Sequence, residues 1–490
     1  NATHQIKKMT KQQLLELRDR LYLLDEIRPD DLEDGIPPYY RPSKDSEEYQ
    51  YMMGRRRALD GSLPHRQVQV RRPLPQPSEV VFKGFQEGSG GRVVSTTMVF
   101  TGLLRELMRE EGFGQRVVPI VPDEARTFGM EALFRQVGIY AHAGQLYEPV
   151  DRDTLLYYKE AEDGQILEEG INEAGSMSSF IAAGTAYATH GINTIPFYIF
   201  YSMFGLQRVG DLVWAGADMR MRGFVVGGTS GRTTLNGEGL QHEDGNSHVL
   251  SLPVPNCLSY DPTFAYELAV IIEDGIKRMY YDGDQVFYYL TVMNEQYAHP
   301  AMPEGARDGI LKGMYVVKPT AKPKAKLRAQ LFGSGTILTE ALKAQAILEE
   351  KYNVGADVWS VTSYGNLYKD GHACERWNRL HPTETPRLPY VTQATKDAPG
   401  VFVAASDYLK VLPDAIDRWL PRRVHSLGTD GFGRSETRAA LRNFFEVDAR
   451  FITLATLYAL MEEKQVEPKV VAQAIKDLGI DTEKADPAVS

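Results

Sequence analysis

Short runs of consecutive apolar residues recur between residues 78 and 300, and polar or turn-forming positions bound each of them. Five runs have the length of a buried β-strand: 116–121, 194–201, 223–228, 256–260 and 285–292. Continuous apolar strands that alternate with helices are typical of a mostly parallel sheet covered on both faces. The pattern therefore predicts an α/β fold for this region.

Two helices between these strands are predicted from the spacing of their apolar residues and from a capping residue. The first carries an apolar stripe at helical intervals, made by Met130, Leu133, Phe134 and Val137. The second runs from Pro262 to Tyr280, with Asp261 as its N-cap. Both fit the alternating order of strands and helices.

A second, smaller α/β unit follows a connector at 294–309. Its predicted strands are 325–333, 356–363 and 400–406. A helix over 337–350 lies between the first two strands, and terminal helices begin from Ser435 onward.

The N-terminal part is predicted as a helix followed by an irregular connector. A capping box formed by Thr10 and Gln13 starts the helix. Its apolar stripe consists of Leu14, Leu17, Leu21 and Leu24. Proline and glycine crowd the segment from Gly35 to Pro77, so we expect a covering linker there and no separate domain.

The predicted domain organisation follows from these patterns. It consists of the tail of a preceding domain plus linker at 1–77, a first α/β domain at 78–300, a linker at 301–325 and a second α/β domain at 326–490. Because the chain begins with Asn1 and not with Met, we expect that sequence upstream has been removed or belongs to another chain.

Composition limits the classes of partner and compartment. The formal net charge of −10 lacks the basic footprint that nucleic acid or an anionic membrane requires. The only two cysteines, Cys257 and Cys374, are far apart and favour a reducing compartment over a disulfide framework. No apolar run reaches the roughly 18 residues of a spanning helix. We therefore expect a cytoplasmic protein without nucleic-acid or membrane partners.

Three polar segments follow predicted strands of the first sheet: 122–131, 201–208 and 229–248. In a parallel α/β sheet, ligands bind beyond the carboxyl ends of the strands. We therefore expect the three segments to meet at one edge and to form the wall of a pocket. Each segment taken singly could also be only a loop.

Three short motifs that often mark a functional site give no support for one here. His242 and His248 are six residues apart, a spacing that fits neither a helical zinc site nor a cysteine pair, so we expect no metal there. The glycine pair at 333–335 is better explained as a tight strand-to-helix turn than as a phosphate site. The G-x-S-x-G elbow of serine hydrolases does not occur in the sequence.

Longer blocks carry a resemblance to a known family. These blocks are "PDEARTFGME" (122–131), "GQILEEGINEAG" (164–175), "IPFYIFYSMFGLQRVGDL" (195–212), "GGTSGRTTLNGEGLQHEDGNSH" (227–248) and "LGTDGFGRSETR" (427–438). In this order they resemble the homodimeric-type pyruvate dehydrogenases, the thiamin-diphosphate-dependent decarboxylating components of bacterial pyruvate dehydrogenase complexes. The resemblance implies a transketolase-like fold, with a pyrimidine-binding α/β domain followed by a C-terminal transketolase-like domain.

The resemblance implies roles for residues at the cofactor. Glu173 matches the glutamate that hydrogen-bonds the aminopyrimidine ring and promotes loss of the thiazolium proton; without the resemblance it would be a carboxylate at a helix start. Tyr201 and Phe204 match the aromatic residues of the pyrimidine pocket, where they would desolvate Glu173; the alternative is core packing. The residues that match the wall of the same cofactor pocket are Asp123, Glu124 and Ile171.

Two histidines match residues that act on substrate and product. His242 matches the histidine that faces bound pyruvate or the first covalent intermediate, where it could donate to a developing oxyanion. His4 matches a histidine of a mobile loop implicated in acetyl transfer to a lipoyl group. The implied partners are pyruvate, a lipoyl-bearing dihydrolipoamide acetyltransferase and a second copy of the chain in a homodimer.

The chain departs from the family pattern at one point. The family holds the diphosphate and Mg²⁺ by a Gly-Asp-Gly sequence followed by Asn in an N-terminal domain, and no such pair occurs here. We therefore interpret the chain as the C-terminal part of such an enzyme. The alternatives are another thiamin-dependent 2-oxo acid dehydrogenase, a transketolase-type enzyme, or a non-catalytic assembly fragment.

Overall fold

The computed structural model describes residues 8–36, 38, 39, 41–61, 70–123, 125–150 and 158–490. The chain divides into two compact units, residues 1–67 and 68–490, which we describe separately. No helix within the described ranges is long and apolar enough to cross a membrane.

The first unit contains helix α1 (Lys11–Arg20), a 3₁₀ turn (Pro29–Leu32) and helix α2 (Glu47–Ala58). The predicted capping box is confirmed: the Thr10 hydroxyl accepts from the Gln13 N–H at 3.3 Å, and the Gln13 side chain accepts from the Thr10 N–H at 2.9 Å. The predicted apolar stripe is wrong beyond Arg20. The helix ends there because the chain turns at Tyr22, whose φ is +56°, so that Leu24 falls outside the helix.

Helix α2 lies inside the segment that the sequence predicted as an irregular connector. Its residues are held by local interactions, since none of them is buried. Ser46 caps the first turn by accepting from the Tyr49 N–H at 3.3 Å. Acidic residues stand in the first turn and Arg55–Arg57 in the last, which complements the helix dipole. A helix without a buried face gives no apolar periodicity, and so the prediction was wrong at this point.

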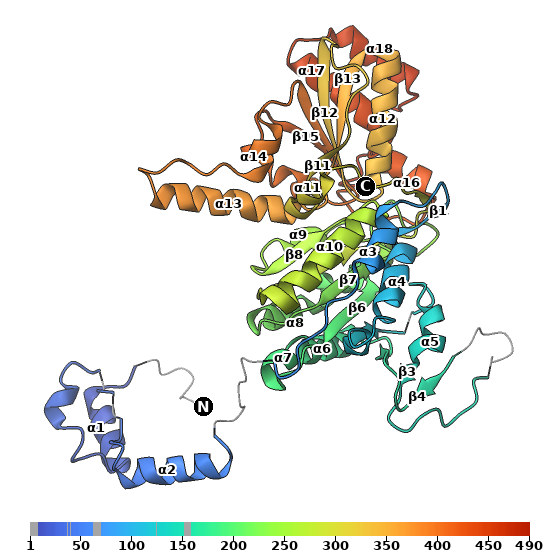
Figure 1. Ribbon diagram of the computed structural model, residues 1–490. Helices are drawn as coiled ribbons and strands as arrows, with labels where there is room; N and C mark the ends of the chain where they lie inside the picture. Colours follow the sequence, from blue (N-terminus) through green and yellow to red (C-terminus); the bar gives the residue numbers. More distant parts are fainter. Residues whose placement is uncertain (1–7, 37, 40, 62–69, 124, 151–157) are drawn as a thin grey trace. The chain divides into compact units, whose positions relative to one another are not determined.

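The second unit contains a six-stranded, entirely parallel sheet in the order β5-β2-β6-β7-β9-β8 (Figure 1). Its strands are β2 (Val117–Val121), β5 (Leu167–Glu168), β6 (Ile195–Tyr201), β7 (Phe224–Gly228), β8 (Cys257–Tyr260) and β9 (Phe287–Thr291). The five predicted strands are confirmed, because continuous apolar runs are what a sheet covered on both faces requires.

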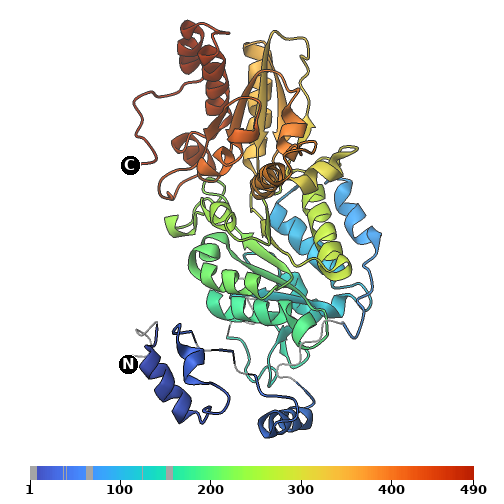
Figure 2. The ribbon, with the colours of Figure 1, turned by 90° about the vertical axis from the view of Figure 1, so that its left-hand side faces the viewer.

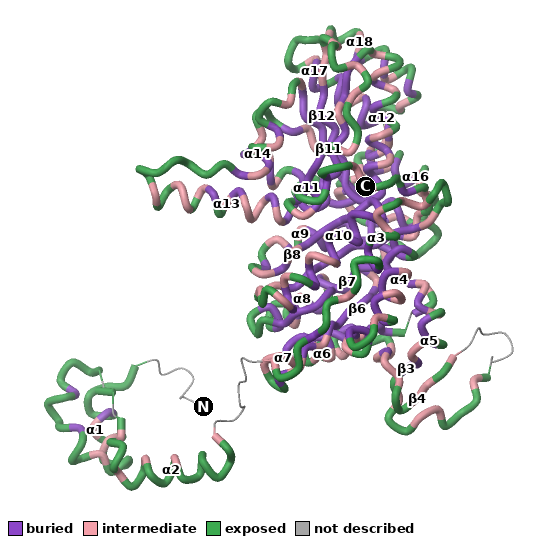
Figure 3. The backbone as a smooth tube through the Cα atoms, viewed as in Figure 1, coloured by how far each residue is buried: buried purple, intermediate pink, exposed green. Residues whose placement is uncertain are grey.

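Helices cover both faces of this sheet (Figure 2). Along β6, Phe197 and Ile199 belong to one apolar cluster, whereas Tyr198 and Phe200 belong to the other. The first cluster includes buried residues of α3 (Glu79–Gln86), α4 (Thr96–Leu107) and α10 (Ala265–Lys277). The second includes those of α6 (Glu173–Gly184) and α8 (Leu206–Asp218). Figure 3 shows the strands between them as buried.

The predicted N-cap of α10 is wrong. The helix begins at Ala265, and Glu267 in its first turn accepts from the N–H groups of the two residues before it, Thr263 at 2.6 Å and Phe264 at 3.0 Å. Asp261 is buried four residues before the helix and accepts from the Thr291 hydroxyl at 2.7 Å. The predicted helix start was therefore three residues too early.

The remaining elements around the first sheet are short. They are α5 (Glu131–Val137), α7 (Ala186–Thr189), α9 (Ser247–Ser251), the 3₁₀ turns η3 (Ser202–Phe204) and η4 (Leu240–His242), a π-helical turn (Arg278–Asp282), and the two-residue strands β1 (Val93–Val94), β3 (Ile139–Tyr140), β4 (Glu160–Ala161) and β10 (Tyr297–Ala298). The apolar stripe predicted for α5 is confirmed.

A second sheet of five strands follows, in the order β11-β13-β12-β14-β15, with only β11 antiparallel to its neighbour. Its strands are β11 (Tyr315–Lys318), β12 (Leu327–Gly333), β13 (Val354–Ser360), β14 (Val401–Ala405) and β15 (Val424–Leu427). Its helices are α11 (Ala306–Lys312), α12 (Ile337–Lys351), α13 (Tyr364–Leu380), α14 (Tyr390–Thr395), α15 (Val411–Asp414), α16 (Arg438–Phe444), α17 (Ala449–Glu462) and α18 (Pro468–Asp477).

The three strands predicted for the second sheet are confirmed. The sequence missed the two edge strands β11 and β15 and the long helix α13. The glycine pair at 333–335 forms the predicted turn between β12 and α12. At Gly335 φ is +49°, and a Cβ would lie 2.5 Å from the Met293 Cε atom, so the turn requires glycine.

Candidate functional site

The segments that follow β2, β6 and β7 meet at the carboxyl edge of the first sheet. Phe128 comes from the first segment, Tyr201 and Phe204 from the end of β6 and η3, and His242 from the third. The ring centroids of Tyr201 and His242 are 4.8 Å apart, and those of Phe204 and His242 are 5.0 Å apart. Phe128 packs edge-on against Tyr201 at 5.4 Å. The predicted convergence of the three segments is thus confirmed, and we call these four residues the ring cluster.

Glu173 is the first residue of α6, where Asn172 provides the N-cap by accepting from the Gly175 N–H at 3.0 Å. The Glu173 side chain is buried, although carboxylates are seldom buried without a partner. Its partner is Arg208, whose Nη1 atom lies 3.4 Å from Oε1. The helix start and this guanidinium together hold the carboxylate at a fixed place.

Arg208 connects Glu173 to the ring cluster. Its guanidinium lies over the Phe204 ring, 3.9 Å from the centroid, in cation–π geometry. Phe204 is therefore joined to Glu173 through a cation. Arg208 was not among the residues predicted for the site. Phe204 ends η3 and Arg208 lies in the first turn of α8, with the non-helical Gly205 between them, so no helical spacing pointed to this pair.

Tyr198 supports the same carboxylate from within the sheet. Its hydroxyl donates to the backbone carbonyl of Glu173 at 3.4 Å. Burial, and next the negative charge of Glu173, raise the pKa of Tyr198 well above its ordinary range. Tyr198 therefore stays neutral and acts as a donor at the start of α6.

His242 ends the 3₁₀ turn η4, and one of its ring nitrogens has no hydrogen-bond partner in the part of the chain that the structure describes. This buried atom, Nδ1, lies 3.9 Å from the Glu238 Oε2 atom, which is beyond hydrogen-bond distance. The ring is held between Tyr201 and Phe204 at the sheet edge, and its side chain is 19% exposed. A histidine so placed could donate to an oxyanion.

The other residues predicted for the site are more peripheral or lie outside the described residues. Asp123 is exposed at the end of β2, and Ile171 is 74% exposed two residues before α6. Burial, and next the charge of Asp123, raise the pKa of nearby Glu168 to about 7. His4 and Glu124 lie outside the described residues.

His248 is not a second ligand to anything that His242 binds. It is buried, its Nε2 lies 2.9 Å from the Thr291 hydroxyl, and burial lowers its pKa to about 3. Within the part of the chain that the structure describes, no group of three His, Cys, Asp or Glu residues could hold a metal ion.

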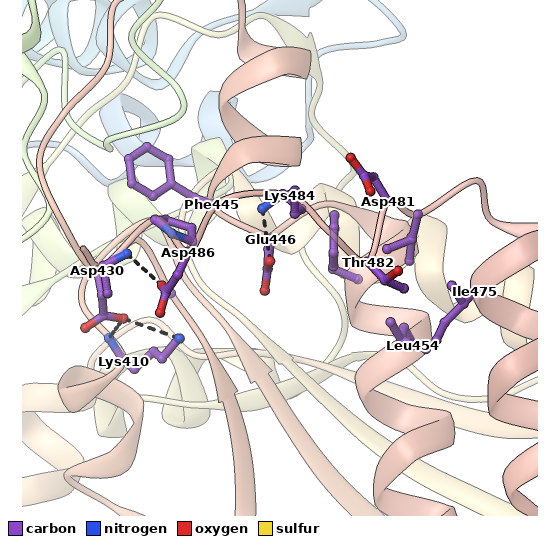
Figure 4. A pocket seen from close by; sticks show the side chains of 15 residues that line it. Lys410, Asp430, Phe445, Glu446, Leu454, Ile475, Asp481, Thr482, Lys484 and Asp486 are labelled. Atoms are coloured by element: carbon purple, nitrogen blue, oxygen red, sulfur yellow. Dashed lines mark hydrogen bonds and ion pairs between the residues drawn. The ribbon is translucent and has the colours of Figure 1, made fainter. Parts of the chain in front are cut away.

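A separate pocket of about 460 Å³ lies in the second sheet's layer (Figure 4). Four of its charged lining residues form ion pairs: Lys484 donates to Glu446 at 3.0 Å, and the ammonium of Lys410 is 3.9 Å from Asp430. Among the described residues, none that the sequence predicted for the site lines this pocket. The ring cluster with Glu173 and Arg208 is therefore the stronger candidate.

Two family models match the second unit. Residues 73–300 match the middle domain of the pyruvate dehydrogenase E1 component. Residues 313–448 match the transketolase-like C-terminal domain. Glu173, Arg208 and the whole ring cluster lie in the first of these matches.

Curated relatives match over nearly the whole chain. The pyruvate dehydrogenase E1 component of Pseudomonas aeruginosa is 52% identical over 488 residues, which are 99% of this chain and 55% of the relative. That of Escherichia coli K12 is 49% identical over 492 residues, which are 100% of this chain and 54% of the relative. The chain thus spans about half the length of the curated relatives it matches.

Solved structures of transketolases share the fold. Transketolase from Leishmania mexicana has a TM-score of 0.58 at 14% identity. The match covers 79% of this chain and 48% of the transketolase chain. A split-gene transketolase, solved as an inactive beta4 tetramer, has a TM-score of 0.50 at 15% identity. The match covers 76% of this chain and 99% of the transketolase chain. At these identities the likeness concerns the fold alone.

Proposed function

Because the chain belongs to the family of pyruvate dehydrogenase E1 components, we propose that it forms part of an enzyme that oxidatively decarboxylates pyruvate with thiamin diphosphate. The observation that carries this proposal is the buried Glu173 carboxylate, fixed at the start of α6 and joined through Arg208 to the ring cluster. A carboxylate at that place can share a proton with a ring nitrogen beside it.

The residues present fit this cofactor. Thiamin diphosphate would supply a thiazolium carbon acid whose deprotonated form can add to the carbonyl group of a 2-oxo acid. Glu173 holds a proton at the pyrimidine nitrogen, and Arg208 keeps the carboxylate in place. Tyr201 and Phe204 offer apolar faces that exclude water. His242, whose ring is held against Tyr201 and Phe204, donates to the substrate oxygen on which negative charge develops.

The diphosphate and its Mg²⁺ are proposed to bind to a part of the enzyme outside this chain. Mg²⁺ needs oxygen ligands in an octahedron, and the sequence motif that provides them in the family does not occur here. Asp123, Glu124 and Ile171 remain proposed as contacts at the pocket wall. We further propose that the enzyme is a cytoplasmic homodimer, with active sites formed across the dimer interface.

The natural acceptor of the acetyl unit is proposed to be the lipoyl group of a dihydrolipoamide acetyltransferase. We expect His4→Ala in the full-length enzyme to spare decarboxylation of pyruvate with an artificial electron acceptor and to impair acetylation of a lipoyl domain. The reason is that an acid or base acting on the dithiolane serves only the second half-reaction. An equal loss in both assays would show that His4 has no such role.

The proposed reaction is tested by turnover of the full-length protein with thiamin diphosphate and Mg²⁺. We expect release of carbon dioxide from pyruvate and reduction of an artificial electron acceptor without any added aldehyde. A requirement for a sugar aldehyde would identify a transketolase-type enzyme. Preference for another 2-oxo acid would identify another thiamin-dependent 2-oxo acid dehydrogenase. Absence of turnover under all these conditions would favour a non-catalytic assembly role.

A further inference from the structure

The two glycine-rich polar segments of the chain are bound to each other. Arg232 is buried, and its Nη1 atom donates to the carbonyl oxygens of Thr429 at 2.5 Å and Gly431 at 2.6 Å. In the other direction, the guanidinium of Arg438 donates through Nε to the Thr234 carbonyl at 2.6 Å. Segment 429–438, which follows the last strand of the second sheet, therefore grips the segment that leads to His242. We call segment 429–438 the clamp.

The clamp also touches the residues on both sides of His242. The Ser435 hydroxyl donates to the Glu238 carbonyl at 2.5 Å, and the Arg434 N–H donates to Glu243 Oε2 at 2.6 Å. Gly433 lies so close that a Cβ atom there would be 2.6 Å from the Leu240 carbonyl oxygen and 3.0 Å from the Glu243 Cβ. The turn η4, which ends at His242, is thus held from behind by backbone of the clamp.

Glu243 is the centre of this contact. It is only 1% exposed, and its Oε1 atom has no hydrogen-bond partner among the described residues. Burial raises the pKa of Glu243 to about 7, while the hydrogen bond from Arg434 acts in the opposite direction. A buried carboxyl group that is incompletely satisfied costs stability. Because the burial of Glu243 costs stability, it is better explained by a role in positioning the turn η4.

The clamp is itself backed by the rest of the second unit. At Gly431, where φ is +104°, a Cβ atom would lie 2.0 Å from the Pro487 carbonyl oxygen. The Thr429 hydroxyl donates to the Asp407 carbonyl at 2.9 Å, beside the end of β14. The same aspartate accepts from the Thr233 N–H at 2.8 Å, so the clamp and the gripped segment share one support. The clamp cannot yield without moving these elements.

We propose that the clamp positions His242. Through its contacts with Glu243 and through Gly433, the clamp fixes the turn η4 against the ring cluster. This inference rests on the proposed function, since it assumes that His242 faces the substrate. It gives the segment that follows the second sheet a part in the reaction. Glu243 and Gly433 are thus positioning residues.

A double-mutant cycle in the full-length holoenzyme tests the proposal. We expect Glu243→Ala to lower kcat for pyruvate by about tenfold to a hundredfold, because small displacements of a reacting group have effects of this size. We expect KM to change little. In a His242→Ala background the same substitution should have no further effect, since the group it positions is gone. Glu243→Gln, which keeps the acceptor for the Arg434 N–H, should retain nearly full activity.

Gly433→Ala provides an independent variant in case Glu243→Ala does not fold, and it should show the same non-additivity with His242→Ala. Gly84→Ala in α3 is the matched control, because no atom lies within 4 Å of a Cβ built there. Equal losses in the presence and absence of His242 would overturn the proposal, as would an inactive Glu243→Gln. Failure of the wild-type enzyme to decarboxylate pyruvate would instead contradict the proposed function.

Discussion

Substitution Glu173→Gln in the full-length enzyme is expected to lower turnover of pyruvate on the order of a hundredfold to ten-thousandfold, the contribution of a positioned acid–base group. The amide has nearly the size of the carboxylate, but it cannot share a proton with the pyrimidine nitrogen. The contact with Arg208 also loses its charge. Steady-state kinetics with an artificial electron acceptor measure the effect, and the circular dichroism spectrum checks that the fold is intact.

The matched control for this substitution is Glu79→Gln. Glu79 is likewise the first residue of a helix, α3, but it is exposed. Loss of a carboxylate at such a place weakens only the interaction with the helix dipole. We expect this control to keep full activity. Near-normal activity of Glu173→Gln would remove Glu173 from the mechanism and leave it the role of a helix-start carboxylate.

Substitution His242→Ala is expected to lower kcat/KM for pyruvate by about 3 kcal/mol in transition-state stabilisation, or more than a hundredfold, the typical effect of one removed oxyanion donor. The melting temperature should hardly change, because the Nδ1 atom of His242 has no hydrogen-bond partner among the described residues. Kinetics and thermal unfolding measured on the same preparation separate these two effects.

His190→Ala serves as the control, since His190 is exposed at the end of α7, on another part of the sheet's cover. It should change neither quantity. If His242→Ala lowers the melting temperature by several degrees and leaves kcat/KM intact, His242 is a structural residue of the turn and not a donor to substrate.

The strands of both sheets could be predicted from their mostly apolar sequences, except for the edge strands β5, β11 and β15. The elements that were missed share a different property. Helix α2 has no buried residue, and β15 is a four-residue edge strand with one fully buried position. Such elements are fixed by capping, charge and neighbouring strands, and these leave little trace in apolar periodicity.

The candidate site shows the same division. Tyr201, Phe204 and His242 stand in polar segments after predicted strands, so topology alone places them together. Arg208 and Glu243 were missed, because their roles depend on contacts across the fold: Arg208 with Glu173, and Glu243 with the backbone of Arg434. The sequence distance between Glu243 and Arg434 is 191 residues, and no local pattern reports such a contact.

Exchange of the thiazolium C2 proton with solvent tests the central claim most directly, namely that Glu173 activates bound thiamin diphosphate. The measurement uses the full-length enzyme with cofactor and Mg²⁺ in deuterated buffer, acid quench at increasing times, and proton NMR of the released cofactor. We predict exchange in the wild type at least as fast as turnover, and exchange slowed on the order of a hundredfold or more in Glu173→Gln. Equal exchange rates in the two proteins, with the cofactor bound in both, would contradict the account.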